Sequence, residues 1–152
     1  MNKHQGYILL ELVITLIIFA VLAVMAAPMV SSIKAETDLN DSTESLIAVI
    51  KKAQADAQLE RRVIRVNLNT NNASSDSEYT WSSTGNAKLY KSPAEKAFYF
   101  GTNGRLQQSL TSTTPISLVI LGVCNGSGNT FSRQITINYL GVITDKEVAN
   151  CV

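Results

Sequence analysis

The chain has 152 residues, a length that suits one domain plus an anchor rather than two domains. Because 45% of the residues are hydrophobic and 16% are charged, the composition is that of a folded protein. The formal net charge of +1 gives no overall reason to expect nucleic-acid binding, so only a local basic patch would support it.

The first predicted element is an apolar helix close to the N-terminus. From Ile8 to Ala27 every residue is apolar except Glu11 and Thr15. About 20 residues at ~1.5 Å each are enough to cross the hydrocarbon core of a bilayer. A charge in lipid costs at least ~2.5 kcal/mol and usually marks function. A plain membrane anchor therefore leaves the carboxylate unexplained.

A secretory signal peptide is an alternative for the same segment. Lys3 and His4 would supply its basic start, and residues 24–26 resemble a small-residue cleavage site. The apolar stretch is too long for such a signal, however, and a signal core rarely carries a carboxylate.

A third interpretation accounts for every residue of the segment. The polar leader MNKHQ ends in Gly6, Tyr7 follows, and Glu11 is the fifth residue after the glycine. This pattern resembles the class III signal of type IV pilins and type II secretion pseudopilins. The resemblance implies that a prepilin peptidase removes residues 1–6 and that Tyr7 becomes the N-methylated terminus. It also implies a helix kink at Pro28, where the family often has a proline.

The position of Glu11 also has a physical reason within this interpretation. Cleavage creates an ammonium group in or beside the membrane, and a carboxylate one helical turn away, or on a neighbouring subunit, can neutralise it. Two such charges in a poorly hydrated site attract strongly, and either one alone is costly. We therefore expect Glu11 to set the register during assembly, and both the cis and the trans pairing stay open.

The helical pattern continues into the polar part of the chain. A stripe of apolar residues lies at helical spacing. Its members are Leu39, Leu46, Ile50, Ala53 and Ala57. We expect one long helix from about Ile8 to about Glu60, in which residues 7–30 form the transmembrane or filament-core part.

The pattern changes to a period of two at Val63, which predicts strands. The expected strands are Val63–Leu68, Tyr79–Ser82, Lys88–Tyr90, Ala97–Phe100, Leu106–Ser109, Ile116–Cys124 and Arg133–Leu140. The fold class is therefore α+β: a long N-terminal helix packed on a small antiparallel β-sheet head, with residues 31–152 forming the amphipathic helix and a periplasmic head.

The two cysteines, Cys124 and Cys151, are an even pair in a chain with an export-like start, which favours a disulfide. Two unrelated buried thiols are the alternative. A disulfide would clip the chain end to the sheet.

Two stretches of the head narrow the resemblance. Residues 46–57, followed by the strand Val63–Leu68, resemble the helix-to-strand junction of GspH/FimT-type minor pilins, and residues 98–106 resemble the turn in their mid-head region. The resemblance implies a minor pilin of a tip or priming complex that promotes pilus assembly. Its partners would be other minor and major pilins, the prepilin peptidase and the inner membrane, and the head would become extracellular in the pilus.

No enzyme, cofactor or metal site is expected. The single histidine, His4, lies in the leader, so no Ser-His-Asp or Cys-His set remains. The cysteines lack metal-ligand spacing.

Two other functions stay as alternatives. The first is DNA binding in natural transformation, which some related pilins perform with a Gly-Arg-x-Arg motif. Residues 141–144 lack both arginines, and Arg105 matches only the first, so it is a weak candidate contact. Arg61, Arg62 and Arg65 are expected to be a solvated charge run. The second alternative is a GspH-like pseudopilin of type II secretion.

Overall fold

The computed structural model describes residues 4–70, 75–109, 111, 118–125, 131–149 and 151, without the side chains of residues 4–6 and 25–30. The chain forms two compact units, Met1–Lys34 and Ala35–Val152. The second unit is referred to below as the head.

A single helix, α1 (His4–Leu59), runs through both units, as the sequence predicts. It ends where Arg61 adopts a left-handed backbone conformation with φ of 50°, and the Glu60 N–H closes the last turn on the Asp56 carbonyl at 2.9 Å. The backbone at Pro28 is helical, but its side chain lies outside the described residues, so the kink expected there stays a prediction.

The apolar stripe of α1 is buried in the head, which confirms the predicted face. All of its members, from Leu39 to Ala57, are at most 3% exposed. Two polar residues, Ser42 and Thr43, are buried beside the stripe. The Thr43 hydroxyl donates to the Leu39 carbonyl at 2.8 Å, and Ser42 Oγ accepts from the Thr84 backbone N–H at 3.0 Å. These hydrogen bonds remove the cost of burying the two hydroxyls.

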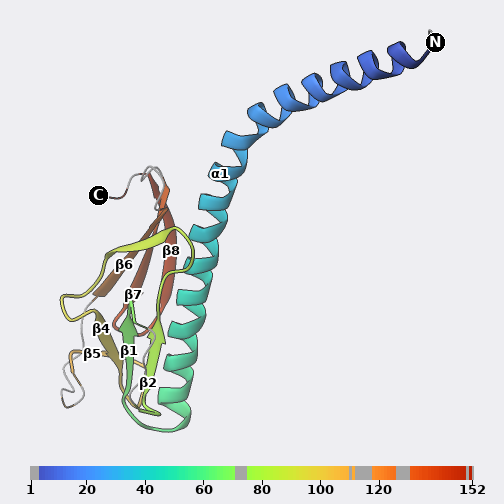
Figure 1. Ribbon diagram of the computed structural model, residues 1–152. Coiled ribbons are helices and arrows are strands. Elements are labelled where there is room, and N and C mark those ends of the chain that lie inside the picture. The colour runs from blue at the N-terminus through green and yellow to red at the C-terminus, as the bar shows by residue number, and fades with distance from the viewer. Residues whose placement is uncertain are drawn as a thin grey trace. The chain divides into compact units, whose positions relative to one another are not determined.

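Within the residues that the structure describes, eight strands complete the head, in two sheets of four (Figure 1). The strands are β1 (Ile64–Leu68), β2 (Glu78–Trp81), β3 (Ala87–Lys91), β4 (Ala97–Phe100), β5 (Leu106–Gln107), β6 (Leu118–Asn125), β7 (Phe131–Asn138) and β8 (Ile143–Ala149). The first sheet has the order β2-β1-β4-β5 and the second has the order β3-β6-β7-β8.

The strands refine the predicted head in three ways. The head contains two sheets rather than one, and the β1–β2 pair is parallel whereas the other pairs are antiparallel. Strand β5 has two residues, fewer than the range Leu106–Ser109 predicts. Strand β8 was not predicted, because its sequence ITDKEVA places three charged residues in succession at 145–147 and hides the alternation. The first residues of the predicted strand Ile116–Cys124 lie outside the described residues.

The core of the head lies between α1 and both sheets. One cluster of buried side chains contains the α1 stripe and residues from both sheets. Phe98 and Phe100 of β4 meet edge to face, with ring centroids 5.7 Å apart and planes at 81°. The helix and both sheets therefore share one core.

Candidate assembly site

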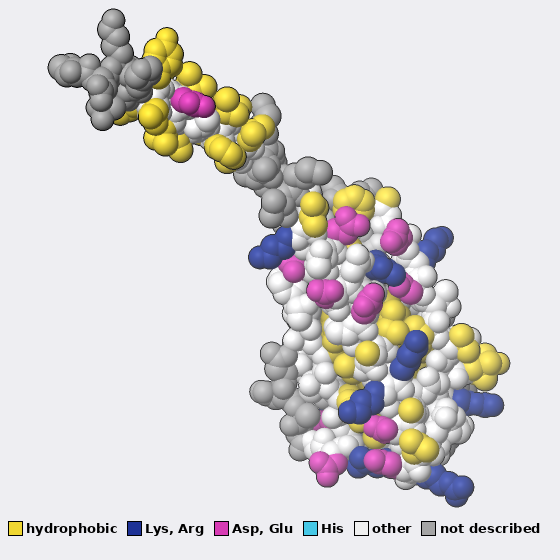
Figure 2. Space-filling model, turned by 90° about the vertical axis from the view of Figure 1, so that its right-hand side faces the viewer, with side chains coloured by type: hydrophobic (Ala, Val, Ile, Leu, Met, Phe, Trp, Pro, Cys, Tyr) yellow, Lys and Arg dark blue, Asp and Glu magenta, His cyan; other side chains and the backbone are white. Residues whose placement is uncertain are grey.

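The N-terminal part of α1 is an apolar surface with no cover within its unit. Residues Tyr7–Val24 have a mean hydropathy of 2.8 and none of them is buried, so this segment is long and apolar enough to cross a membrane. Figure 2 shows this part as a nearly continuous apolar surface with an acidic group in it. In the sequence, Glu11 is the one charged residue of the segment.

The helix places Tyr7 and Glu11 on one face. They are four positions apart, which is about one turn and a rise of ~6 Å. Tyr7 is 78% exposed. The other polar side chain nearby, Thr15, donates to the Leu12 carbonyl at 2.8 Å and so stays satisfied on an apolar surface. Gly6 is part of the helical backbone, and residues 1–3 of the leader lie outside the described residues.

The predicted disulfide between Cys124 and Cys151 is confirmed. It joins the end of β6 to the C-terminal segment, with Cα atoms 5.9 Å apart. Cys124 also pairs with Ser132 in the β6–β7 register, and Ser132 Oγ donates to the Val148 carbonyl at 2.9 Å. The disulfide therefore lies at the end of the head where β7 begins and β8 ends.

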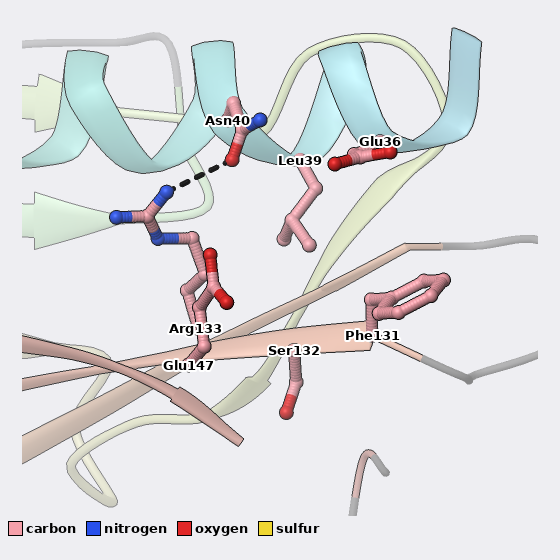
Figure 3. A pocket seen from close by; sticks show the side chains of 7 residues that line it. All are labelled: Glu36, Leu39, Asn40, Phe131, Ser132, Arg133 and Glu147. Carbon is pink, nitrogen blue, oxygen red and sulfur yellow. Dashed lines mark hydrogen bonds between the residues drawn. The ribbon is translucent and has the colours of Figure 1, made fainter. Parts of the chain in front are cut away.

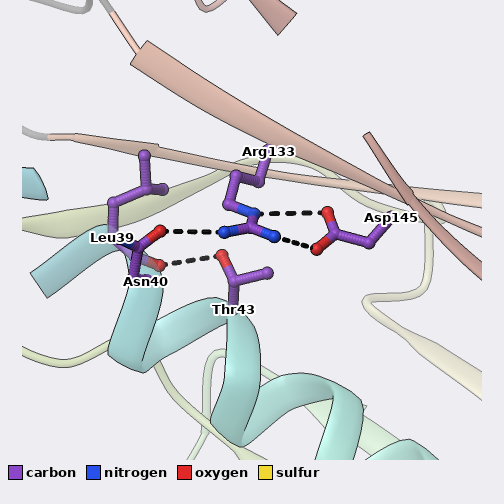
Figure 4. A network of polar contacts seen from close by, with 5 residues as sticks. All are labelled: Leu39, Asn40, Thr43, Arg133 and Asp145. Atoms are coloured by element: carbon purple, nitrogen blue, oxygen red, sulfur yellow. Dashed lines mark hydrogen bonds and ion pairs between the residues drawn. The ribbon is translucent and has the colours of Figure 1, made fainter. Parts of the chain in front are cut away.

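A polar network at the same end joins α1 to the second sheet (Figure 4). The Arg133 guanidinium on β7 forms an ion pair with Asp145 on β8 and donates to Asn40 Oδ1 on α1 at 2.9 Å. The hydrogen bond with Asp145 raises the pKa of Arg133, as do the nearby carboxylates of Glu147 and Glu44, while burial lowers it. Asn40, Arg133 and Asp145 were not predicted as a unit, because the sequence does not say which strand faces the helix.

A small cavity of about 100 Å³ opens beside this network (Figure 3). Its walls come from α1, β7 and β8. The lining residues are Glu36, Leu39, Asn40, Phe131, Ser132, Arg133 and Glu147. Leu39 is buried, and Phe131 is 59% exposed. We refer to this cavity as the acidic cavity, since Arg133 is paired with Asp145 and the remaining charged lining residues are both glutamates.

The predicted basic run is only partly a solvated charge run. Arg62 donates to Ser77 Oγ at 3.1 Å and to the Asp76 carbonyl at 2.7 Å. Arg65 lies over the Tyr99 ring, 5.8 Å from its centroid. These two guanidinium groups hold the helix-to-strand junction against the first sheet, whereas Arg61 is exposed. Both also form ion pairs, Arg62 with Glu60 and Arg65 with Glu78.

Arg105 is exposed at the opposite end of the head from the acidic cavity. The turn that carries it is fixed to its neighbours: Gln54 Nε2 of α1 donates to the Gly104 carbonyl at 3.1 Å, and the Leu106 N–H donates to the Tyr139 carbonyl at 3.3 Å. Gly104 has φ of 71°, a conformation that favours glycine. The turn after β4 and the β7–β8 turn thus pack side by side against α1.

Within the described residues, no group of three or more His, Cys, Asp or Glu side chains is arranged to hold a metal ion.

Comparisons with known proteins identify the fold. No model of a known protein family matches the sequence, and no curated protein matches it. Two crystal structures of the type IV minor pilin FimU from Pseudomonas aeruginosa do match the structure. One has a TM-score of 0.57 at 16% identity and covers 77% of this chain and 97% of FimU. The other has a TM-score of 0.54 at 18% identity, with 75% and 100% covered.

The chain has the fold of a type IV minor pilin. At this level of identity the likeness concerns the fold alone. This chain itself has a long N-terminal helix with an apolar start, packed on a β head. The likeness in fold does not assign roles to Gly6, Glu11 or Arg105.

Proposed function

We propose that this chain is a minor type IV pilin, made as a membrane-inserted precursor and assembled with other pilins. The observation that carries the proposal is the combination of a minor-pilin head with an exposed apolar helix whose one carboxylate lies one turn after Tyr7. Its role is structural rather than enzymatic.

The proposed maturation begins with cleavage after Gly6 by a prepilin peptidase and N-methylation of Tyr7. The new ammonium group then pairs with Glu11. Packing of the apolar helix against neighbouring helices supplies most of the assembly energy, and Glu11 sets the register. The mature subunit enters a tip or priming complex and helps to start or top the filament.

The test uses two substitutions in a strain that makes the pili. Gly6→Leu is expected to block processing, which appears as an unshifted precursor band. Glu11→Val is expected to leave membrane insertion intact and to lower the amount of protein in sheared pili. The matched control is Leu12→Val, a neighbouring substitution that changes no charge. Normal incorporation of Glu11→Val would contradict the proposed register role.

A type II secretion pseudopilin is the alternative within the same fold, and the likeness to FimU favours the pilus. Deletion of the gene separates them, since loss of pili and of twitching motility supports a pilin, whereas loss of secreted proteins supports a pseudopilin. DNA binding is less favoured, because Arg62 and Arg65 are engaged within the head. A gel shift of DNA by the protein at low salt that disappears at high salt would support the DNA-binding alternative.

A further inference from the structure

The two ends of the head differ in charge and in exposed apolar surface. At one end lies the acidic cavity. At the other lies a surface that we call the turn surface, formed by the exposed residues Arg105, Tyr139, Leu140 and Val142. The two surfaces lie at opposite ends of elements that they share, so the lengths of these elements give the distance between them. Strand β7 runs from Phe131 at the cavity to Asn138 at the turn, about 23 Å at ~3.3 Å per residue.

The helix gives the same separation independently. Asn40 lines the cavity and Gln54 contacts the turn surface through Gly104. The 14 positions between them correspond to about 21 Å at ~1.5 Å per residue. The cavity and the turn surface therefore lie at opposite ends of the head.

The residues that line the acidic cavity carry a net negative charge. Its only cation, Arg133, is paired with Asp145, and within the described part of the chain neither Glu36 nor Glu147 forms an ion pair. Residues 35–50 of α1 contain four acidic residues and no Lys or Arg. In Figure 2 several acidic side chains gather toward one end of the head, with some Lys and Arg side chains among them.

The cavity also offers apolar contacts for the stem of a side chain. Leu39 lines it, and the Phe131 ring at its mouth is 59% exposed. A ring in this position can contact both a methylene stem and the face of a guanidinium group. Aliphatic and aromatic groups beside carboxylates suit an arginine that arrives with apolar neighbours.

The turn surface presents such an arginine together with exposed apolar side chains. Tyr139, Leu140 and Val142 are 46%, 45% and 54% exposed, respectively. Arg105 is exposed next to them, because Leu106 bonds to Tyr139 and the Gly104 carbonyl lies beside Gly141. Within the described residues Arg105 forms no ion pair. An exposed cation thus lies beside three exposed apolar side chains.

We propose that the turn surface of one head docks into the acidic cavity of a second copy of this chain. Arg105 lies between Glu36 and Glu147 of the other copy, and the apolar turn covers Phe131. The surfaces are different and lie at opposite ends, so the contact is heterologous and leaves one cavity and one turn surface unoccupied. Such a contact does not close on itself as a two-fold dimer does. This inference rests on the proposed function, since it describes how heads meet in an assembly.

The experiment uses the full chain in cells that process it. Two copies carry different affinity tags, and in one of them Leu140 is replaced by the photo-cross-linker p-benzoylphenylalanine. Irradiation is expected to give a product that carries both tags, with the cross-link mapped to the cavity, near Phe131 or Leu39. A homologous product mapped elsewhere, or no product with both tags, would overturn the proposal.

Charge reversal tests the ion pair within that contact. Arg105→Glu in the copy with the cross-linker, or Glu147→Arg in the other, is expected to lower the cross-linking yield about fivefold or more. Combining the two is expected to restore much of the yield. The matched controls, Lys91→Glu and Glu95→Arg, make the same charge changes at exposed positions outside both surfaces. Equal effects of the controls would refute the pairing.

The outcomes also separate this inference from the proposed function. A cross-link from position 140 to a different pilin only would replace the second copy as the occupant and overturn the proposal, while the minor-pilin role would stand. If Glu11→Val incorporates normally and the head cross-link still forms, the proposed register role fails and the docking stands.

Discussion

Loss of the disulfide is expected to lower the stability of the head by an amount that the structure allows us to estimate. The Cys124–Cys151 bond joins residues that are 27 positions apart in the sequence. For a loop of this length, the chain-entropy relation gives about 3.5 kcal/mol at 25 °C. The closed loop contains all of β7 and β8, so these strands lose most when the bond is reduced.

The single tryptophan provides the assay. Trp81 is 4% exposed, and its indole N–H donates to Ser45 Oγ of α1 at 2.9 Å, so its fluorescence reports contact between β2 and the helix. Urea unfolding of the full chain in detergent is followed with and without reductant. We expect the midpoint to fall by roughly 1–3 M urea on reduction. Thermal unfolding is expected to shift downward by about 10–15 °C.

A double variant controls for side effects of the reductant. Cys124→Ala with Cys151→Ala is expected to unfold like the reduced parent and to be insensitive to reductant. A loss below about 1 kcal/mol on reduction, or an unchanged electrophoretic mobility, would refute the reasoning. In that case either the bond is absent or the unfolded chain is already restricted to the same extent.

Three further predictions concern the head. Arg133→Met is expected to cost about 1–2 kcal/mol in urea unfolding, because it leaves the partly buried Asp145 without its cation; an unchanged midpoint would show that solvent screens the pair. The hydrogen bond to Asp56 raises the pKa of Tyr79 to about 12 from 10.0, so the stability it adds is complete below pH 10 and is lost as the pH rises toward 12. The stability difference between the parent and Tyr79→Phe should therefore shrink over that pH range, and a constant difference would argue against the bond. Gly104→Ala is expected to lower the free energy of unfolding by about 1–2 kcal/mol, because the backbone at Gly104 has φ of 71°, which strains an alanine. An unchanged unfolding temperature would contradict this.

The long helix and its buried face could be predicted from the sequence, because the residues on one face of a helix recur at a fixed spacing. Leu39 and Ala57 are far apart in sequence and still belong to one stripe. Strand β4 was predicted with its observed bounds, since Ala97–Phe100 is a short apolar run between polar turns. The local pattern of apolar residues is sufficient to predict an element when that pattern alone shows which of its residues are buried.

The polar contacts at the ends of the head could not be predicted in this way. Asn40 and Arg133 are 93 positions apart, and only the packing of β7 against α1 brings them together. Charged residues also conceal the strand they belong to. With Asp145, the sequence of β8 resembles a loop, yet Asp145 forms the ion pair with Arg133, which also bonds to the helix. Pairing between distant elements is a property of topology, and a single sequence carries little information about it.

The helix geometry bears on the partner of Glu11. Side chains of an α-helix lean toward its N-terminus, over the preceding turn. The Glu11 carboxylate therefore leans toward Tyr7, four positions earlier, where cleavage after Gly6 would create the ammonium group. We infer that the two charges pair within one subunit while it waits in the membrane, since neither has another partner in lipid. Glu11→Gln should slow incorporation less than Glu11→Val, because an amide can still accept a hydrogen bond from the amine.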